Sequence, residues 1–119
     1  MRTNLAEYTN EEKSLLLYLE TRLVDHMGRV DGRNINAEDC DIAKKLMEEG
    51  LIEFGRISMR IILSQQKKGL FFNNTNWVRF TDLAWKLTHE ERRLRSERMI
   101  EHNYQELEVE MARGRKFPI

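Results

Sequence analysis

The 119-residue chain predicts a single, mostly helical α+β domain with a two-stranded hairpin and a long C-terminal helix. Three observations lead to this fold class. Apolar residues recur at helical spacing in three separate stretches, helix-capping residues stand before each stretch, and two short strand patterns lie between the second and the third. Charged residues make up 34% of the chain and hydrophobic residues 40%, which favours long helices with one solvated face.

The first helix is expected to begin after Thr9 and to end near Gly28. Thr9 and Glu12 have the spacing of a capping box, in which each side chain accepts a hydrogen bond from the backbone of the other residue. Apolar residues then recur at spacings of three and four, as on the buried face of a core helix: Leu16, Leu19, Leu23 and Met27, with Leu15 and Tyr18 beside them. After it, Asp31-Gly32 indicates a turn.

The second helix is expected between Asn36 and Gly50, and it leads directly into a strand. Asn36 is a favourable N-cap, and Gly50 can adopt the left-handed conformation that ends a helix. Leu51 can then contact Leu46, as in a Schellman closure. The strand from Leu51 to Ile57 follows without a loop.

The junction KKLMEEGLIE, from Lys44 to Glu53, resembles the point at which the recognition helix of a winged-helix protein enters the wing. The resemblance implies a winged-helix-like core over residues 1–88, followed by a charged helical extension over residues 89–119. Only seven residues separate Gly28 from Asn36, which is too few for a further full helix. Either the first helix supports the recognition helix directly, or the motif is degenerate.

Four other stretches resemble small uncharacterised proteins of bacterial and prophage genomes. This resemblance implies a bacterial or phage origin and no known activity. The stretches are GRVDGRNINAED (Gly28 to Asp39), EFGRI (Glu53 to Ile57), NWVRFTDLAW (Asn76 to Trp85) and HEERR (His89 to Arg93).

The segment after the first strand has two interpretations. Alternation of apolar and polar residues from Ile57 to Leu63 favours a strand. Ser58 is equally suited to cap a short helix that ends near Lys68. Beyond a polar turn at residues 73–76, the strand from Trp77 to Phe80 is expected to pair with the strand that begins at Leu51 and so complete the hairpin.

The charge distribution along the chain suggests a nucleic-acid contact. The chain has no net charge, but residues 1–50 contain seven Lys and Arg against eleven Asp and Glu, whereas residues 51–81 contain five against one. Gln65, Gln66, Asn73, Asn74 and Asn76 add hydrogen-bonding groups to the basic part, and Phe71 and Phe72 add rings that can stack. The candidate nucleic-acid-binding residues are Arg56, Arg60, Lys67, Lys68 and Arg79.

The start of the second helix argues against base reading by that helix. Glu38, Asp39 and Asp41 occupy positions that would face the DNA backbone in a recognition helix, and they would repel it. Two hypotheses follow: a non-enzymatic regulator that contacts duplex DNA through the basic hairpin, or a protein-interaction module such as a phage-encoded adaptor or inhibitor of a host machine.

The last helix is expected to begin at Thr81 or Asp82. Its first part can face the core through Leu83, Ala84, Leu87 and Leu94. Farther along, four residues recur at spacings of four, three and four and predict an interface between two copies of the chain: Ile100, Tyr104, Leu107 and Met111. The alternative is that this seam folds back onto the first helix of the same chain, with a bend between Thr88 and Arg93.

The remaining sequence features suggest no catalytic or metal chemistry. The three histidines lack metal-ligand spacing, and no nucleophile motif or phosphate-binding glycine loop is present. We therefore expect no enzyme, no metal and no cofactor. A single cysteine, Cys40, and the lack of an apolar run that could span a bilayer predict a cytoplasmic protein that does not bind membranes.

Overall fold

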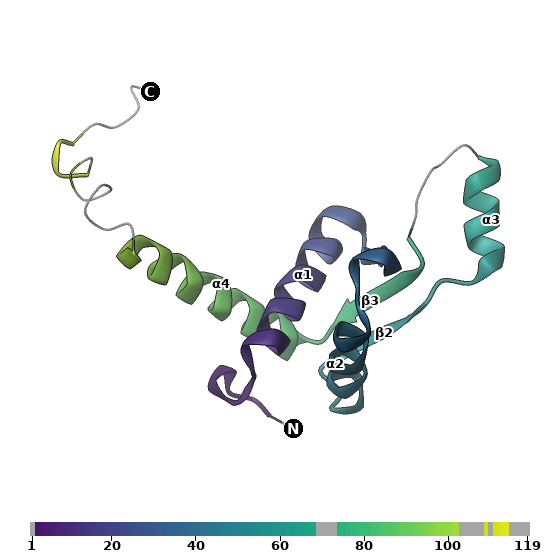
Figure 1. Cartoon of the computed structure of the whole chain (residues 1–119), viewed down its shortest axis with the longest axis horizontal. Coiled ribbons are helices and arrows are strands. Elements are labelled where there is room, and N and C mark those ends of the chain that lie inside the picture. The colour runs from purple at the N-terminus through teal and green to yellow at the C-terminus, as the bar shows by residue number, and fades with distance from the viewer. Residues whose placement is uncertain (1, 69–73, 103–108, 110, 115–119) are drawn as a thin grey trace.

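A computed structural model of the chain describes residues 2–68, 74–102, 109 and 111–114. Within them it has an α+β architecture with four α-helices and one three-stranded antiparallel sheet (Figure 1), which confirms the predicted fold class at this level. The predicted pairing of the strand after Leu51 with the strand that ends at Phe80 is confirmed, and the sheet contains one strand more than the predicted two. The elements are η1 (Leu5–Glu7), α1 (Asn10–His26), β1 (Arg29–Val30), η2 (Gly32–Asn34), α2 (Ala37–Glu48), β2 (Ile52–Arg56), α3 (Met59–Lys67), β3 (Asn76–Phe80) and α4 (Asp82–His102).

The additional strand is β1, which forms one edge of the sheet. The strand order is β1-β3-β2, so β3 lies in the centre and pairs with both neighbours. Arg29 stands opposite Trp77 on one side of β3, and Glu53 stands opposite Arg79 on the other. A strand of two residues is too short to show an alternating pattern, which is why the sequence indicated only the turn at Asp31-Gly32 here.

Helix α1 has the predicted start and end. The Thr9 side chain accepts a hydrogen bond from the Glu12 backbone at 3.1 Å, and the Glu12 carboxylate accepts one from the Thr9 backbone at 2.9 Å. Gly28 follows the helix with φ of 77°, and a Cβ atom built on it would lie 2.7 Å from the Val78 carbonyl oxygen. A glycine at this position therefore lets β3 pass close to the end of α1.

The α2–β2 corner also forms as predicted. Asn36 and Asp39 form a capping box at the start of α2. At its end the Leu51 amide donates to the Leu46 carbonyl at 3.0 Å, and the Gly50 amide donates to the Met47 carbonyl at 3.0 Å. These two bonds are the pair that defines a Schellman motif, with Gly50 at φ of 78°.

The hydrophobic core lies between α1, α2, the inner face of the sheet and the first half of α4. We call these elements, with α4 taken as residues 82–94, the body. The largest fully buried apolar side chains come from α1, α2 and the sheet: Leu16 and Leu19 from α1, Leu46 from α2, Leu51 and Ile52 at β2, Val30 and Val78 from β1 and β3.

Helix α4 runs without interruption from Asp82 to His102, so the bend expected between Thr88 and Arg93 in the fold-back alternative is wrong. Thr88 does not restart a helix, because its buried hydroxyl donates to the Ala84 carbonyl within the same helix at 3.1 Å. The helix crosses α1 and is joined to it by polar contacts. Arg92 pairs with Glu20, and Arg95 donates to the Ser14 hydroxyl at 3.0 Å.

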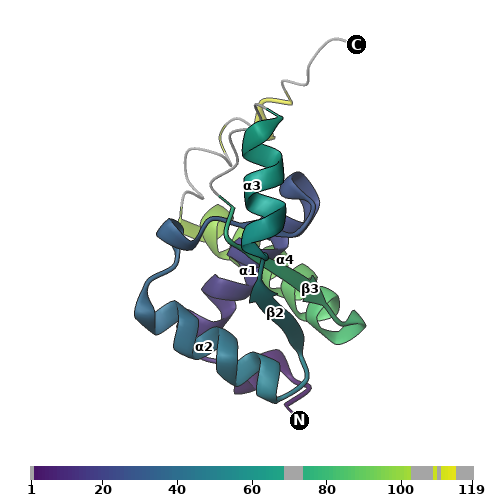
Figure 2. The ribbon, with the colours of Figure 1, turned by 90° about the vertical axis from the view of Figure 1, so that its right-hand side faces the viewer.

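Of the two interpretations of residues 58–68, the helix is correct, and it is α3. Ser58 caps it, and its hydroxyl oxygen accepts from the Ile61 backbone amide at 3.4 Å. None of the nine residues of α3, all of which the structure describes, is buried. The helix projects from the body beyond the ends of β2 and β3, where the Gln65 amide oxygen can accept from the Arg29 guanidinium of β1 at 2.8 Å. The second half of α4 leaves the body on the opposite side (Figures 1 and 2).

Candidate nucleic-acid interface

Three of the five predicted nucleic-acid-binding residues lie together on α3. Arg60 stands in its first turn, Lys67 is its last residue, and Lys68 is its C-cap. All three side chains are exposed. Arg60 and Lys67 are seven residues apart, and two turns of helix place them on the same side. The connection between β2 and β3 thus presents a cationic helix to solvent.

The other two candidate residues lie elsewhere. Arg79 is on β3, where it shares the outer face of the sheet with Trp77 and stands opposite Glu53. Arg56 is at the end of β2, on the face that carries Phe54, because alternate residues of a strand point to opposite faces. The fold therefore does not bring the five residues into one patch, and α3 is the part that gathers positive charge.

The asparagines near β3 have structural hydrogen bonds. The Asn74 side-chain oxygen accepts from Arg22 at 2.9 Å. The Asn76 side chain donates to the Gly55 carbonyl at 3.2 Å and accepts from the Thr75 hydroxyl at 2.7 Å. These side chains hold the base of the β2–β3 connection. Asn73, Phe71 and Phe72 lie outside the described residues.

The first turn of α2 is acidic, as the sequence indicates. Glu38 is exposed, and Asp39 is committed to the capping box with Asn36. Negative charge at a helix N-terminus stabilises the helix through its dipole. The same charge opposes the approach of phosphates, so α2 is poorly suited to lie against a DNA backbone.

An ionic cluster that the sequence did not predict joins the N-terminal segment to α1 and α2. Arg2 donates to the Glu12 carboxylate at 2.6 and 2.9 Å, and to the Glu49 carboxylate at 2.9 and 3.0 Å. Hydrogen bonding from Arg2 lowers the pKa of Glu12 from 4.5 to about 2. The guanidinium also lies 4.2 Å from the centre of the Tyr8 ring. The residues of this cluster are far apart in the sequence, so no local sequence pattern predicts it.

The predicted interface between two copies is only partly within the described residues. Ile100 lies in the last turns of α4 and is 41% exposed. Met111 is 67% exposed. Tyr104 and Leu107 lie outside the described residues, and the seam stays a prediction.

The described part of the chain gives no sign of a metal centre or a membrane span. It contains no group of three His, Cys, Asp or Glu side chains placed to hold a metal ion. None of its helices is both long enough and apolar enough to cross a bilayer. Comparisons with known family models, curated proteins and solved structures each found no match.

Proposed function

We propose that this protein is a non-enzymatic DNA-binding regulator of winged-helix type whose main contact with duplex DNA is the β2–β3 connection. The order of elements supports the fold assignment. A helix and an edge strand are followed by the acidic helix α2, which runs directly into β2, and β3 returns between the other two strands. In a winged helix the β2–β3 connection is the wing, and here the wing carries α3.

The observation that carries the proposal is the placement of Arg60, Lys67 and Lys68 on a helix that projects away from the acidic first turns of α1 and α2. Cations in this position can approach phosphates without bringing the acidic first turn of α2 against the backbone. Lys and Arg contacts to phosphates supply the sequence-independent part of DNA affinity. Binding is therefore expected to be of low sequence specificity and strongly dependent on salt.

The test is a charge reversal on α3. Lys67→Glu with Lys68→Glu is expected to abolish binding to a labelled duplex at low salt, measured by fluorescence anisotropy. The matched control is Lys44→Glu with Lys86→Glu, which makes the same change in net charge at exposed positions on α2 and α4. Binding that is equally weakened by both variants, or no binding by the native protein at low salt, contradicts the proposal.

A second function is favoured by a specific observation on the same helix. Met59, Ile61 and Leu63 of α3 are 65%, 49% and 51% exposed, and contact with phosphates does not require apolar side chains. Met59 and Leu63 lie on the same side of the helix, and contiguous apolar patches are the ones that mark protein contacts. The alternative proposal is thus a protein-interaction module, such as a phage-encoded adaptor or inhibitor of a host machine.

This alternative is tested by affinity capture from nuclease-treated lysate of a bacterial host. The native protein and a Leu63→Asp variant serve as paired baits. A protein retained by the native bait and lost from the variant supports the module. Recovery of nucleic acid from untreated lysate, with no protein that distinguishes the two baits, contradicts it.

A further inference from the structure

Helix α3 has an apolar side that is largely open to solvent, because Met59 is 65% and Leu63 is 51% exposed. At 100° per residue, Met59, Ile62 and Leu63 fall on one side of the helix, together with Gln66. Arg60 and Lys67 flank this side at one edge. An isolated helix of nine residues is marginal in water, and most helical stability in proteins comes from burial of an apolar face. We therefore expect α3 to be stabilised by docking of its apolar side on another surface.

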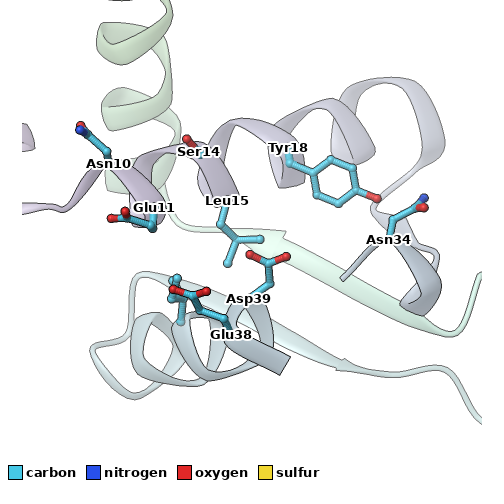
Figure 3. A pocket seen from close by; sticks show the side chains of 9 residues that line it. Asn10, Glu11, Ser14, Leu15, Tyr18, Asn34, Glu38 and Asp39 are labelled. Carbon is cyan, nitrogen blue, oxygen red and sulfur yellow. The ribbon is translucent and has the colours of Figure 1, made fainter. Parts of the chain in front are cut away.

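The body contains a groove of matching character between α1 and the start of α2 (Figure 3). Its volume is about 350 Å³, and its apolar floor is formed by Leu15, Tyr18 and Ile42. Three acidic residues stand around it: Glu11 from the first turn of α1, and Glu38 and Asp39 from the first turn of α2. Asn10, Ser14 and Asn34 complete the lining.

The groove lies beside the connection between β1 and α2. Residues 31–36, all of which the structure describes, form only the three-residue turn η2 there, and Asn34 of this turn lines the groove. The connection forms no α-helix of its own, which leaves room for a short amphipathic helix from another copy.

We propose that α3 of one copy of this chain docks in the α1–α2 groove of a second copy, and that the exchange is reciprocal. Met59, Ile62 and Leu63 would cover the apolar floor. Arg60 and Lys67 would meet Glu11 and Glu38 on the rim. Charge complementarity selects this occupant, because the part of the chain that contains the groove, residues 1–50, has four more acidic than basic residues and residues 51–81 have four more basic than acidic.

The position of α3 in the fold favours docking on a second copy over docking on its own chain. The helix leaves its own body at the end of β2 and stands apart from α1 and α2 (Figures 1 and 2). Two copies related by a two-fold axis can each supply a helix and receive one, which is the isologous arrangement most common among homodimers. Each dimer then contains the same contact twice.

Tyr18 contributes its ring, and not its hydroxyl, to the same contact. Its hydroxyl oxygen is inaccessible to water and has no hydrogen-bond partner among the described residues. A side chain that docks from outside does not reach this covered oxygen, so the proposed dimer leaves the hydroxyl as it is. This inference stands independently of DNA binding, although docking would cover Arg60 and Lys67 and so compete with it.

The first test removes the apolar side of α3 in the full-length chain and uses sedimentation velocity without DNA. The native protein is expected to shift from monomer to dimer with concentration. Met59→Gln with Leu63→Gln is expected to remain a monomer at all concentrations. Ile61→Gln with Ser64→Gln, which introduces the same residues away from the docking side, is expected to dimerise as the native protein does. All four positions are exposed, so none of these changes disturbs the core.

The second test is a charge swap between two variants. Arg60→Glu with Lys67→Glu reverses the charge on α3. Glu11→Lys with Glu38→Lys reverses the charge on the rim of the groove and leaves the Asp39 cap intact. Each variant alone has two mismatched contacts and is expected to be a monomer. In an equimolar mixture both contacts of a mixed dimer have opposite charges again, so the mixture is expected to dimerise.

Rescue in the mixture also shows that both variants are folded. A native protein that is monomeric at every concentration overturns the proposal, including the case in which α3 folds back within its own chain. Dimerisation of each charge variant alone overturns it too. So does a dimer that Ile100→Asp with Leu107→Asp dissociates and Met59→Gln with Leu63→Gln does not, because the interface would then be the C-terminal seam.

Discussion

Helices α1 and α3 have similar N-caps, but α1 is packed in the core and α3 is exposed to solvent. Each is capped by a hydroxyl side chain, Thr9 or Ser58, and each has an apolar side. Helix α1 buries six of its residues, and α3 buries none. The difference shows that apolar periodicity predicts a helix and the side it will bury, whereas the surface that covers this side depends on where the chain places the helix.

The largest expected contrast comes from truncating one leucine in each helix. Leu19 is fully buried, so Leu19→Ala leaves a cavity in the body and should lower the free energy of unfolding by about 3 to 4 kcal/mol. Leu63 is half exposed, so Leu63→Ala should change it by less than about 0.5 kcal/mol in dilute solution. Urea unfolding at low protein concentration measures both. A similar loss in the two variants would mean that α3 packs on its own body.

The next contrast is between the charges of the body and those of α3. Arg2 hydrogen bonds to Glu12, whose side chain is 3% exposed, whereas the cations of α3 lie at the surface. Arg2→Met should cost about 3 kcal/mol at neutral pH, because it leaves a buried carboxylate without its main partner. Lys67→Met should cost almost nothing. Chemical denaturation at pH 7 compares them.

The pH dependence of the same contrast has a definite sign. The pKa of Glu12 is about 2 in the folded protein against 4.5 for the free side chain. A lowered pKa stabilises the fold above pH 4.5, and the stabilisation is lost as the pH falls from 4.5 toward 2. Unfolding free energies measured between these pH values should therefore fall steeply for the native protein and less steeply for Arg2→Met. Parallel curves for the two would show that Arg2 does not hold this carboxylate.

The elements that the sequence predicted well are those whose determinants are local. Asn36, Gly50 and Leu51 lie within a few residues of the bonds they make, and the α2–β2 corner forms as expected. Segment 58–68 was ambiguous because Ile57, Met59, Ile61 and Leu63 alternate as in a strand. The sheet resolves the ambiguity, since the pairing of β2 with β3 reaches only Arg56 opposite Asn76.

The candidate sites were predictable only in part, because they combine residues that are far apart in the sequence. The positive charge of residues 51–81 could be counted directly, and three of its cations do gather on α3. That Arg56 and Arg79 lie on opposite faces of the sheet depends on strand register, which no single stretch reveals. The α1–α2 groove combines residues from Asn10 to Ile42, and the Arg2 cluster joins residues 47 positions apart.

A smaller effect is expected at the glycine that ends the acidic helix α2. Gly50 has φ of 78°, and no heavy atom lies within 4 Å of a Cβ built on it. Gly50→Ala should therefore cost about 1 kcal/mol through backbone conformation alone. Gly50→Asn should cost less, because asparagine tolerates this conformation better. Thermal unfolding ranks the two variants, and a larger loss for asparagine would point to a steric contact instead.

The smallest effect is expected from removing the hydroxyl of Tyr18, whose ring lines the groove. In the monomer the buried hydroxyl lacks a hydrogen-bond partner among the described residues, so Tyr18→Phe should leave the unfolding temperature unchanged or raise it slightly. In the proposed dimer the hydroxyl stays covered within its own copy, so the same change should leave association unchanged because the ring keeps its packing.

Thermal unfolding in dilute solution and sedimentation at high concentration separate these two contributions, with Tyr8→Phe as the control. Tyr8 is buried in the body, and its hydroxyl donates to the Arg2 carbonyl at 2.7 Å. Tyr8→Phe should therefore destabilise the monomer by about 1 kcal/mol and leave association unchanged. A monomer that Tyr18→Phe destabilises as much as Tyr8→Phe does would show that the Tyr18 hydroxyl already has a partner within its own chain. The groove would then be a packed part of the body, and the difference between it and α3 would disappear.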